Sequence, residues 1–273
     1  MIGEVCFSNG GRPLDSGRPL LVFVHGAGMD HTVWQLVTRH FATHGFSVMA
    51  LDLPGHGGTP GPPPDSIGGY RTWLVDLLDE MREGHGFGGA HLVGQSMGAL
   101  IALAVAATRP DVVRSLALLG VGARMLVNRD LLDAAKRDDH LAHELMASWS
   151  HSRRAHTGGS PTPGLWMMGA TLRLLERSAP GLLYNDLAAC DAYEGAIEAA
   201  GKLGCETLFL LGEDDVMVRP SAAVALVEAA PWSRSIVLPG AGHMVMVEQP
   251  DAIIDALAAF LADGPSPSEG DRA

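Results

Sequence analysis

A serine between two glycines is the first candidate for chemistry in this sequence. Ser96 stands in the pattern Gly-Gln-Ser-Met-Gly of residues 94–98, after the apolar run His91–Gly94 and before the helix-forming residues 99–107. A strand-to-helix turn this sharp needs glycines, because side chains at the flanking positions would collide with the neighbouring backbone. Such a turn exposes the hydroxyl and aims the N–H groups of the following helix beside it. We therefore expect Ser96 to be a nucleophile, with an ordinary tight turn as the alternative.

Two glycine-containing segments near the end of the chain supply a base and an acid. A serine hydroxyl needs a base to become a nucleophile, and the base needs an orienting carboxylate. Asp214 and Asp215 come directly after one apolar run, and His243 lies in a glycine loop after the last such run. The chain has 12 histidines, and this context distinguishes His243 from the others. We expect His243 to activate Ser96, with Asp214 or Asp215 as its partner.

Backbone N–H groups are expected to complete this site. Attack on an acyl carbonyl builds negative charge on oxygen, which N–H groups fixed in advance stabilise. One donor is expected at Met97, the residue after the serine, and the other in the loop His25–Gly28, at Ala27. His25 itself is expected to hold this loop in place rather than to react.

Short apolar runs recur along the chain and indicate how these residues are brought together. Continuous apolar runs closed by glycine are typical of strands buried on both faces. Segments of helical length alternate with them, which predicts a mostly parallel sheet covered by helices on both sides. The expected strands are Leu20–Val24, Ser47–Leu51, His91–Gly94, Ser115–Leu119, Thr207–Leu211 and Ser235–Leu238. The expected helices are Thr32–His44, Tyr70–Arg82, Met97–Thr108, Pro220–Ala229 and Asp251–Ala262.

One interval, residues 122–204, interrupts this alternation. It has no strand candidate and is helical, polar and rich in His, Met and Trp, with a Gly/Pro cluster at residues 157–164. We interpret it as a helical cap inserted into one core of residues 1–121 and 205–263, with residues 264–273 as a flexible tail. Its large apolar side chains are either pocket residues or ordinary core fillers. The pocket candidates are Trp149, Trp166, Met167, Met168 and Met125.

A run of histidines in the same interval raises the question of a metal site. His140, His143, His151 and His156 lie close together in sequence. No carboxylate or cysteine spacing completes a ligand set, so we expect a solvated helix face. The expected chemistry requires no cofactor and no metal.

The composition limits the class of protein. With 273 residues, 47% of them hydrophobic, the chain can form one sizeable core without a metal or disulfide scaffold. A formal net charge of -12 argues against a nucleic-acid partner and against an anionic membrane surface. The three cysteines form no short-spaced pair and are expected to be reduced thiols. Without a signal-peptide pattern or an apolar run of membrane-spanning length, we expect a cytoplasmic enzyme.

These motifs together resemble the α/β-hydrolase superfamily over nearly the whole chain. VFVHGAGMDHTVW resembles its oxyanion loop, LDLPGHGGT its D-x-P-G-x-G-x-S loop with Thr59 where serine is usual, and VGQSMGA its nucleophile elbow. LLGEDDVMVRP resembles its acid loop, where the family places Asp three residues after the glycine, which favours Asp215. GAGHMVMVEQPD resembles its histidine segment. The serine at position 96 distinguishes this chain from the haloalkane dehalogenases and epoxide hydrolases, which have Asp at the nucleophile position.

The resemblance and the motifs together imply a serine hydrolase that cleaves a small-molecule carboxylic ester through an acyl-enzyme. The expected triad is Ser96, Asp215 and His243, with Ala27 and Met97 as oxyanion donors. Other readings use the same residues: a carbon–carbon bond hydrolase, a lactonase or an acyltransferase. A non-catalytic ligand receptor that kept the fold belongs to another class. The natural substrate stays open, and so does the oligomeric state, for which a homodimer is one possibility.

Overall fold

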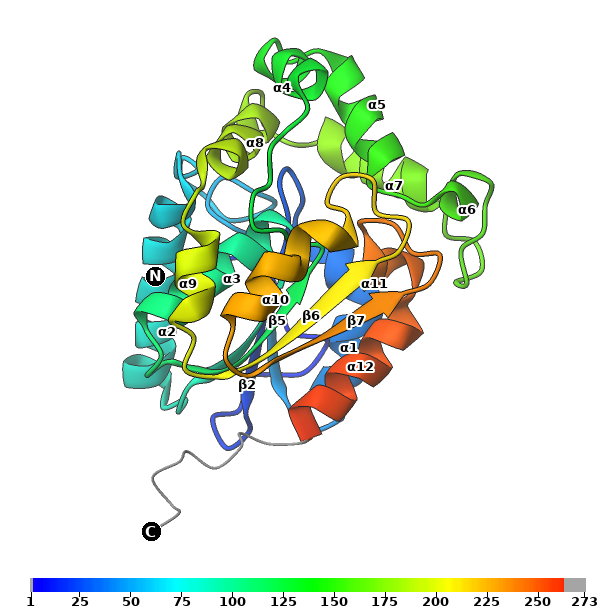
Figure 1. Cartoon of the computed structure of the whole chain (residues 1–273). Helices are drawn as coiled ribbons and strands as arrows, with labels where there is room; N and C mark the ends of the chain where they lie inside the picture. The colour runs from blue at the N-terminus through cyan, green and yellow to red at the C-terminus, as the bar shows by residue number, and fades with distance from the viewer. Residues whose placement is uncertain (1, 263–273) are drawn as a thin grey trace.

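A seven-stranded sheet forms the centre of the computed structural model, which describes residues 2–262 (Figure 1). The strand order is β1-β3-β2-β4-β5-β6-β7, and all neighbouring pairs are parallel except β1 with β3. The strands are β1 (Phe7–Ser8), β2 (Leu20–Val24), β3 (Ser47–Leu51), β4 (Ala90–Gln95), β5 (Val113–Leu119), β6 (Glu206–Gly212) and β7 (Ser233–Leu238). The predicted α/β class and mostly parallel sheet are confirmed. The short strand β1 has no counterpart among the expected strands.

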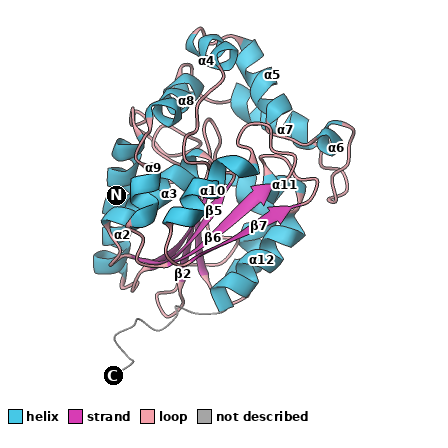
Figure 2. Cartoon of the chain, in the orientation of Figure 1, coloured by secondary structure: helices cyan, strands magenta, loops and turns pink. Residues whose placement is uncertain are grey.

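Helices cover both faces of the sheet, as Figure 2 shows by colour. On one face, α1 (Gln35–Thr43) contacts α12 (Pro250–Ala262) and the short helix α11 (Val245–Glu248). On the other face, α3 (Met97–Thr108) packs against α2 (Ile67–His85) and contacts β4 and β5. The remaining helices near the sheet are α10 (Val224–Ala229) and the 3₁₀ turns η1 (Ile2–Glu4), η2 (His31–Trp34) and η3 (Pro220–Ala223).

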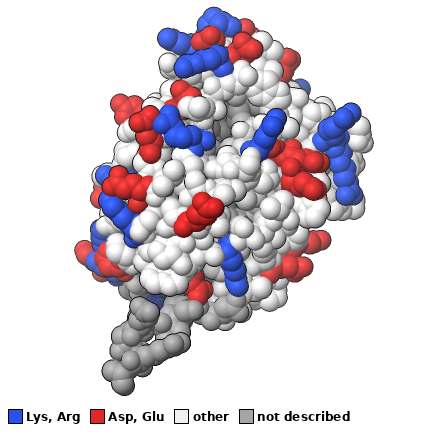
Figure 3. All heavy atoms as spheres, in the orientation of Figure 1, with Lys and Arg blue, Asp and Glu red and all other residues white. Residues whose placement is uncertain are grey.

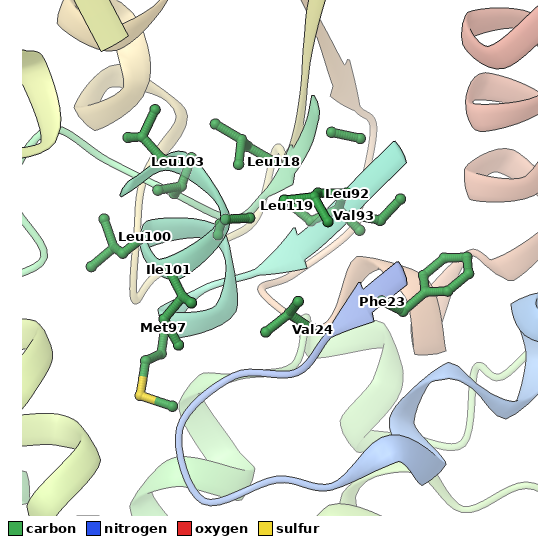
Figure 4. Close-up of a cluster of buried hydrophobic side chains, with 14 of the residues drawn as sticks. Phe23, Val24, Leu92, Val93, Met97, Leu100, Ile101, Leu103, Leu118 and Leu119 are labelled. Atoms are coloured by element: carbon green, nitrogen blue, oxygen red, sulfur yellow. The ribbon is translucent and has the colours of Figure 1, made fainter. Parts of the chain in front are cut away.

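Helix α3, which begins directly after Ser96, lies inside the core. Its residues 97–106 are all buried, because its apolar side chains point in every direction, as expected for an internal helix. Figure 4 shows Leu100, Ile101 and Leu103 of this helix among side chains of the central strands. The helix that starts at the candidate nucleophile is therefore fixed on all sides by packing.

Between β5 and β6 the described chain contains helices and no strand. Helices α4 (Arg129–Lys136), α5 (His140–Trp149), α6 (Arg153–His156), α7 (Met167–Glu176) and α8 (Leu182–Ala192) lie above the carboxyl ends of the strands (Figure 1). We call α4–α8 the inserted helices. The last helix of the interval, α9 (Ala196–Gly201), instead packs against α3 and α10.

The position of α9 corrects the expected boundary of the insertion at residue 204. Ala196, Ala199 and Ala200 are buried, so this helix belongs to the layer that covers the sheet. The expected flexible tail, residues 264–273, lies outside the described residues. None of the described helices has the combination of length and hydropathy needed to span a lipid bilayer.

Candidate active site

Ser96 occupies the turn between β4 and α3 in a backbone conformation that is unusual for a residue with a side chain. Its φ is 55° and its ψ is -117°, and conformations of this kind cost about 1–3 kcal/mol. A Cβ on Gly94 would lie 2.3 Å from the carbonyl oxygen of Gly98, and a Cβ on Gly98 would lie 2.3 Å from that of Val24. The turn therefore requires glycine at both positions, which is the reason for the sequence pattern around Ser96.

His243 and Asp215 are brought together by the loops that follow β7 and β6. Nδ1 of His243 donates a hydrogen bond of 2.7 Å to Oδ2 of Asp215, and both side chains are buried. The other carboxylate oxygen accepts hydrogen bonds from the N–H groups of Met217 and Val218, at 2.9 and 2.8 Å. These contacts fix the carboxylate and place the imidazole proton on Nδ1. Asp214, the other candidate, is exposed.

A buried glutamate supports the histidine loop. Glu248 accepts hydrogen bonds from the N–H groups of Gly242, at 3.1 Å, and Ser152, at 3.3 Å. Burial raises the pKa of this carboxyl. A Cβ on Gly242 would lie 2.7 Å from Oε1 of Glu248, so the close approach also requires the glycine. Glu248 lies in the predicted histidine segment, but no local pattern indicates that it links the His243 loop to Ser152 in the inserted interval.

Ser96 and His243 both line a cavity of about 570 Å³ beneath the inserted helices. This volume lies within the range of small-molecule sites. Most of the wall is apolar and comes from the loop before α4, from α5 and α8, and from the loop after β6. Its apolar residues include Met125, Leu131, Met146, Trp149, Leu187 and Val218. The hydrogen bonds among residues 2–262 do not include one between Ser96 Oγ and the imidazole, and such bonds often tighten only when a substrate binds.

The predicted pocket residues divide into two groups. Trp149 and Met125 line the cavity that contains Ser96. Trp166 does not line it and is 67% exposed. Met167 is buried but lines a different cavity, beside η2. The prediction for Trp166 and Met167 was wrong because α7 packs against α5 and carries its first residues toward η2, away from Ser96.

The sequence predicts backbone donors at Ala27 and Met97. Ala27 lines the cavity, and Met97 is the first residue of α3. Within residues 2–262, neither N–H donates to a protein acceptor. The side chain of Met97 is fully buried in the core and does not line the cavity (Figure 4). The side chain of Met97 therefore belongs to the core and not to the cavity wall.

His25 holds the loop that contains Ala27. Its Nδ1 donates to the carbonyl oxygen of Gly26 at 2.8 Å, and its Nε2 accepts from the N–H of Leu53 at 3.1 Å. Burial lowers the pKa of His25 to about 4, so the ring is neutral at pH 7. With one nitrogen bonded within this loop and the other to the segment after β3, His25 has the structural position that we expected.

A second buried Asp–His pair lies behind this loop. Oδ2 of Asp186, on α8, accepts from His56 Nε2 and from the N–H of Gly28, each at 2.8 Å, and Oδ1 accepts from the Tyr70 hydroxyl at 2.7 Å. Nδ1 of His56 donates to the carbonyl oxygen of Pro54 at 3.0 Å. Since both acceptors are oxygens, both ring nitrogens carry protons and the imidazole is cationic.

The pKa directions agree with an ion pair. Burial opposes charge on both groups, but the hydrogen bond and charge of Asp186 raise the pKa of His56 above its ordinary value. The same contact, with Tyr70, holds the pKa of Asp186 below its ordinary range. Asp186 was not among the predicted site residues, because nothing in the sequence separates it from the neighbouring Asn185 and from Asp191 on the same helix.

One group of possible metal ligands is found within the described residues. Cys6, His31 and Asp52 place one ligand atom each within 4.8 Å of one another, away from the cavity of Ser96. Asp52 already accepts from His31 Nδ1 at 2.8 Å and from the N–H of Gly58 at 2.8 Å, so hydrogen bonds account for the cluster. Within the described residues, the histidines of the run form no group of possible metal ligands. His151 is buried, whereas a solvated helix face was expected.

Cys190 is the one thiol in the cavity wall among the described residues. Burial raises its pKa, so the thiol stays protonated at neutral pH. A protonated thiol is a weak nucleophile. Ser96 therefore has no competing cysteine nucleophile in this wall.

Comparisons with known proteins agree with this architecture. The chain matches the family described as alpha/beta hydrolase fold over residues 19–250. It is 27% identical over 255 residues to the (E)-2-((N-methylformamido)methylene)succinate hydrolase of Acinetobacter baylyi, covering 91% of this chain and 92% of that protein. It is 27% identical to the pimeloyl-(acyl-carrier protein) methyl ester esterase of Chromobacterium violaceum, covering 89% and 94%. The enol-lactonase from Burkholderia xenovorans LB400 has a similar structure, with a TM-score of 0.82 at 20% identity over 94% of this chain and 96% of that chain. Because the family match spans the sheet and the inserted helices alike, the chain belongs to the α/β hydrolase family.

Proposed function

We propose that the protein is a serine hydrolase that cleaves a small-molecule carboxylic ester through Ser96, His243 and Asp215. The observation that carries this proposal is the buried hydrogen bond of 2.7 Å between Asp215 and His243, at a cavity that also contains Ser96. The glycine turn that holds Ser96 at the cavity adds support. So do the names of two relatives, a hydrolase and a methyl ester esterase.

The proposed reaction has two halves that use the same residues. His243 Nε2 takes the proton of Ser96 as Oγ attacks the ester carbonyl, and the N–H groups of Ala27 and Met97 stabilise the oxyanion. His243 then protonates the leaving alcohol, which leaves an acyl group on Ser96. Water attacks this acyl-enzyme with His243 again acting as base, and the acid is released. Asp215 keeps the proton on Nδ1 and stabilises the imidazolium.

Substitution of Ser96 tests this proposal directly. Ser96→Ala should lower kcat for p-nitrophenyl butyrate by about 10⁴-fold or more, because no other nucleophile is activated. The far-ultraviolet circular dichroism and the Tm should match those of the wild type. A fluorophosphonate probe should label the wild type and not the variant.

Ser221→Ala is the matched control, because Ser221 is exposed in η3 and does not line the cavity. It should keep full activity and full labelling. Undiminished hydrolysis by folded Ser96→Ala would remove Ser96 from the mechanism. A panel of esters, thioesters and lactones then separates an esterase from a lactonase or an acyltransferase, and a protein that binds these compounds without turnover would be a receptor.

A further inference from the structure

Among the residues that the structure describes, the wall of the candidate active-site cavity contains a cation and no acid. Arg129, the first residue of α4, lines it together with Asn128. Within the described residues, no Asp or Glu lines this cavity, although acidic residues outnumber basic ones by 31 to 19 in the chain. The cavity therefore has the opposite electrostatic character to the protein as a whole.

The guanidinium of Arg129 has no hydrogen-bond or ion-pair partner among residues 2–262. A nearby arginine behaves differently. Arg124 lies outside the cavity wall and forms an ion pair with Glu194, at 2.5 Å. Arg129 is thus a donor group at the cavity that the protein itself leaves available to a ligand.

The start of α4 adds to the positive character of this part of the wall. The first N–H groups of a helix carry partial positive charge, which favours anions. Asn128 caps the helix by accepting from the N–H of Asp130 at 2.8 Å. Asp130 and Asp133 are on the same helix but do not line the cavity. Figure 3 shows this face with a hollow bordered mainly by uncharged atoms and with charges of both signs scattered elsewhere.

The rest of the wall selects for an apolar chain. Met125, Leu131 and Met146 line the same cavity as Ser96 and Arg129, and they offer no charge to a ligand. Burying apolar surface against them is favourable, whereas a charge without a partner there would be costly. An anionic group on the ligand is therefore stabilised at Arg129 and disfavoured elsewhere in the cavity.

On the basis of the proposed function, we infer that the ester cleaved at Ser96 carries an apolar acyl chain that ends in a carboxylate held by Arg129. A planar guanidinium binds a carboxylate through two parallel hydrogen bonds, which also fix the orientation of the chain. The carboxylate takes no part in bond breaking. Hydrolysis breaks the acyl–oxygen bond, adds water, and releases a dicarboxylic acid and an alcohol.

Two substrates of equal chain length test this inference: p-nitrophenyl hexanoate and mono-p-nitrophenyl adipate. The wild type should hydrolyse the adipate ester with a kcat/KM at least equal to that for hexanoate at low ionic strength. Arg129→Gln should lower kcat/KM for the adipate ester by about tenfold, mainly through KM, and change that for hexanoate by less than about threefold. Added salt should weaken the wild-type preference for adipate, because it screens an exposed charge.

Arg124→Gln is the control, since it removes a neighbouring cation outside the cavity. It should leave kcat/KM for both esters unchanged. If Arg129→Gln lowered kcat/KM equally for both esters, or for neither, the inference would be overturned. Hydrolysis of the hexanoate ester that depends on Ser96 would still support the proposed function. Absence of Ser96-dependent hydrolysis of either ester in the wild type would instead count against the proposed function itself.

Discussion

The two buried Asp–His pairs have the same residue types and almost the same hydrogen-bond length between imidazole nitrogen and carboxylate oxygen. This distance is 2.7 Å for Asp215–His243 and 2.8 Å for Asp186–His56. They differ in what surrounds the imidazole. The ring of His243 lines the cavity beside Ser96, whereas His56 is buried and uses both of its nitrogens in hydrogen bonds. A buried Asp–His contact therefore does not by itself indicate catalysis. What distinguishes the candidate catalytic pair is a histidine that lines a cavity which also contains Ser96.

The pair that does not reach the cavity connects three parts of the fold. Asp186 is on α8, Tyr70 is on α2, and Gly28 is in the loop that contains Ala27. The same carboxylate thus joins the inserted helices to the core and to the loop beside Ser96. Removing an acid from each pair should therefore have opposite consequences, one on turnover and one on stability.

The largest effect is expected for Asp215→Asn. The amide cannot stabilise an imidazolium and favours the wrong tautomer of His243, so kcat should fall by about 10⁴-fold. The free energy of unfolding should fall by no more than about 1–2 kcal/mol, because only one charge-assisted contact is weakened. Steady-state kinetics with p-nitrophenyl butyrate and urea denaturation measure the two quantities. Asp214→Asn is the matched control and should alter neither, since Asp214 is exposed.

Asp186→Ala should have the converse effect. It leaves the N–H of Gly28, the hydroxyl of Tyr70 and the cation of His56 without their acceptor, and breaking a buried pair in this way costs about 3–5 kcal/mol. In the fraction that stays folded, kcat should change by no more than about tenfold, because His25 still holds the loop of Ala27. Urea denaturation and kinetics at low temperature check both expectations.

Asp133→Ala serves as the control on the inserted helices, because Asp133 is exposed on α4, and it should cost less than about 0.5 kcal/mol. The distinction between the two pairs fails if folded Asp186→Ala loses as much kcat as Asp215→Asn while keeping wild-type stability.

The fold and the candidate triad were predictable because their signals are local. Ser96 follows β4 directly, and Asp215 and His243 lie in the loops after β6 and β7, each within a few residues of a glycine that the packing requires. The carboxyl ends of parallel strands meet at one edge of a sheet, so the strand pattern also predicts that these residues converge. The strand β1 gave no such signal, because it has only two residues and pairs antiparallel with the distant β3.

Asp186 and the wall of the cavity were not predictable because their contacts are distant in sequence. The partners of Asp186 lie 130, 116 and 158 residues away at His56, Tyr70 and Gly28. The interval was predicted to be helical, but no local pattern places the helix that carries Asp186 or shows which groups meet this side chain. Trp166 shows the same limit, since its residue type suited a pocket and only the packing of α7 against α5 excludes it.

The smallest of these effects, the pH dependence of the second pair, sharpens the comparison further. The pKa of His56 is raised in the folded protein, so its contribution to stability is complete below the unfolded value of about 6.5 and is lost as the pH rises through the folded value. The pKa of Asp186 is lowered, so its contribution is present above about 3.9 and is lost only as the pH falls through its folded value. The pair should therefore contribute most between about pH 4 and 6.5.

His56→Gln tests this sign, because glutamine keeps a hydrogen-bond donor and removes the charge. The difference in free energy of unfolding between wild type and variant should be largest near pH 5.5 and should decline toward pH 9, by less than the loss expected for Asp186→Ala. His91 and His151, whose pKa values burial lowers to about 4, are present in both proteins and cancel in this difference. His25 is 4.9 Å from the ring of His56, so the comparison is made at pH 5.5 and above, where His25 stays neutral. A difference that grew toward pH 9 would mean that His56 is neutral in the fold, and the contrast with His243 would then rest on geometry alone.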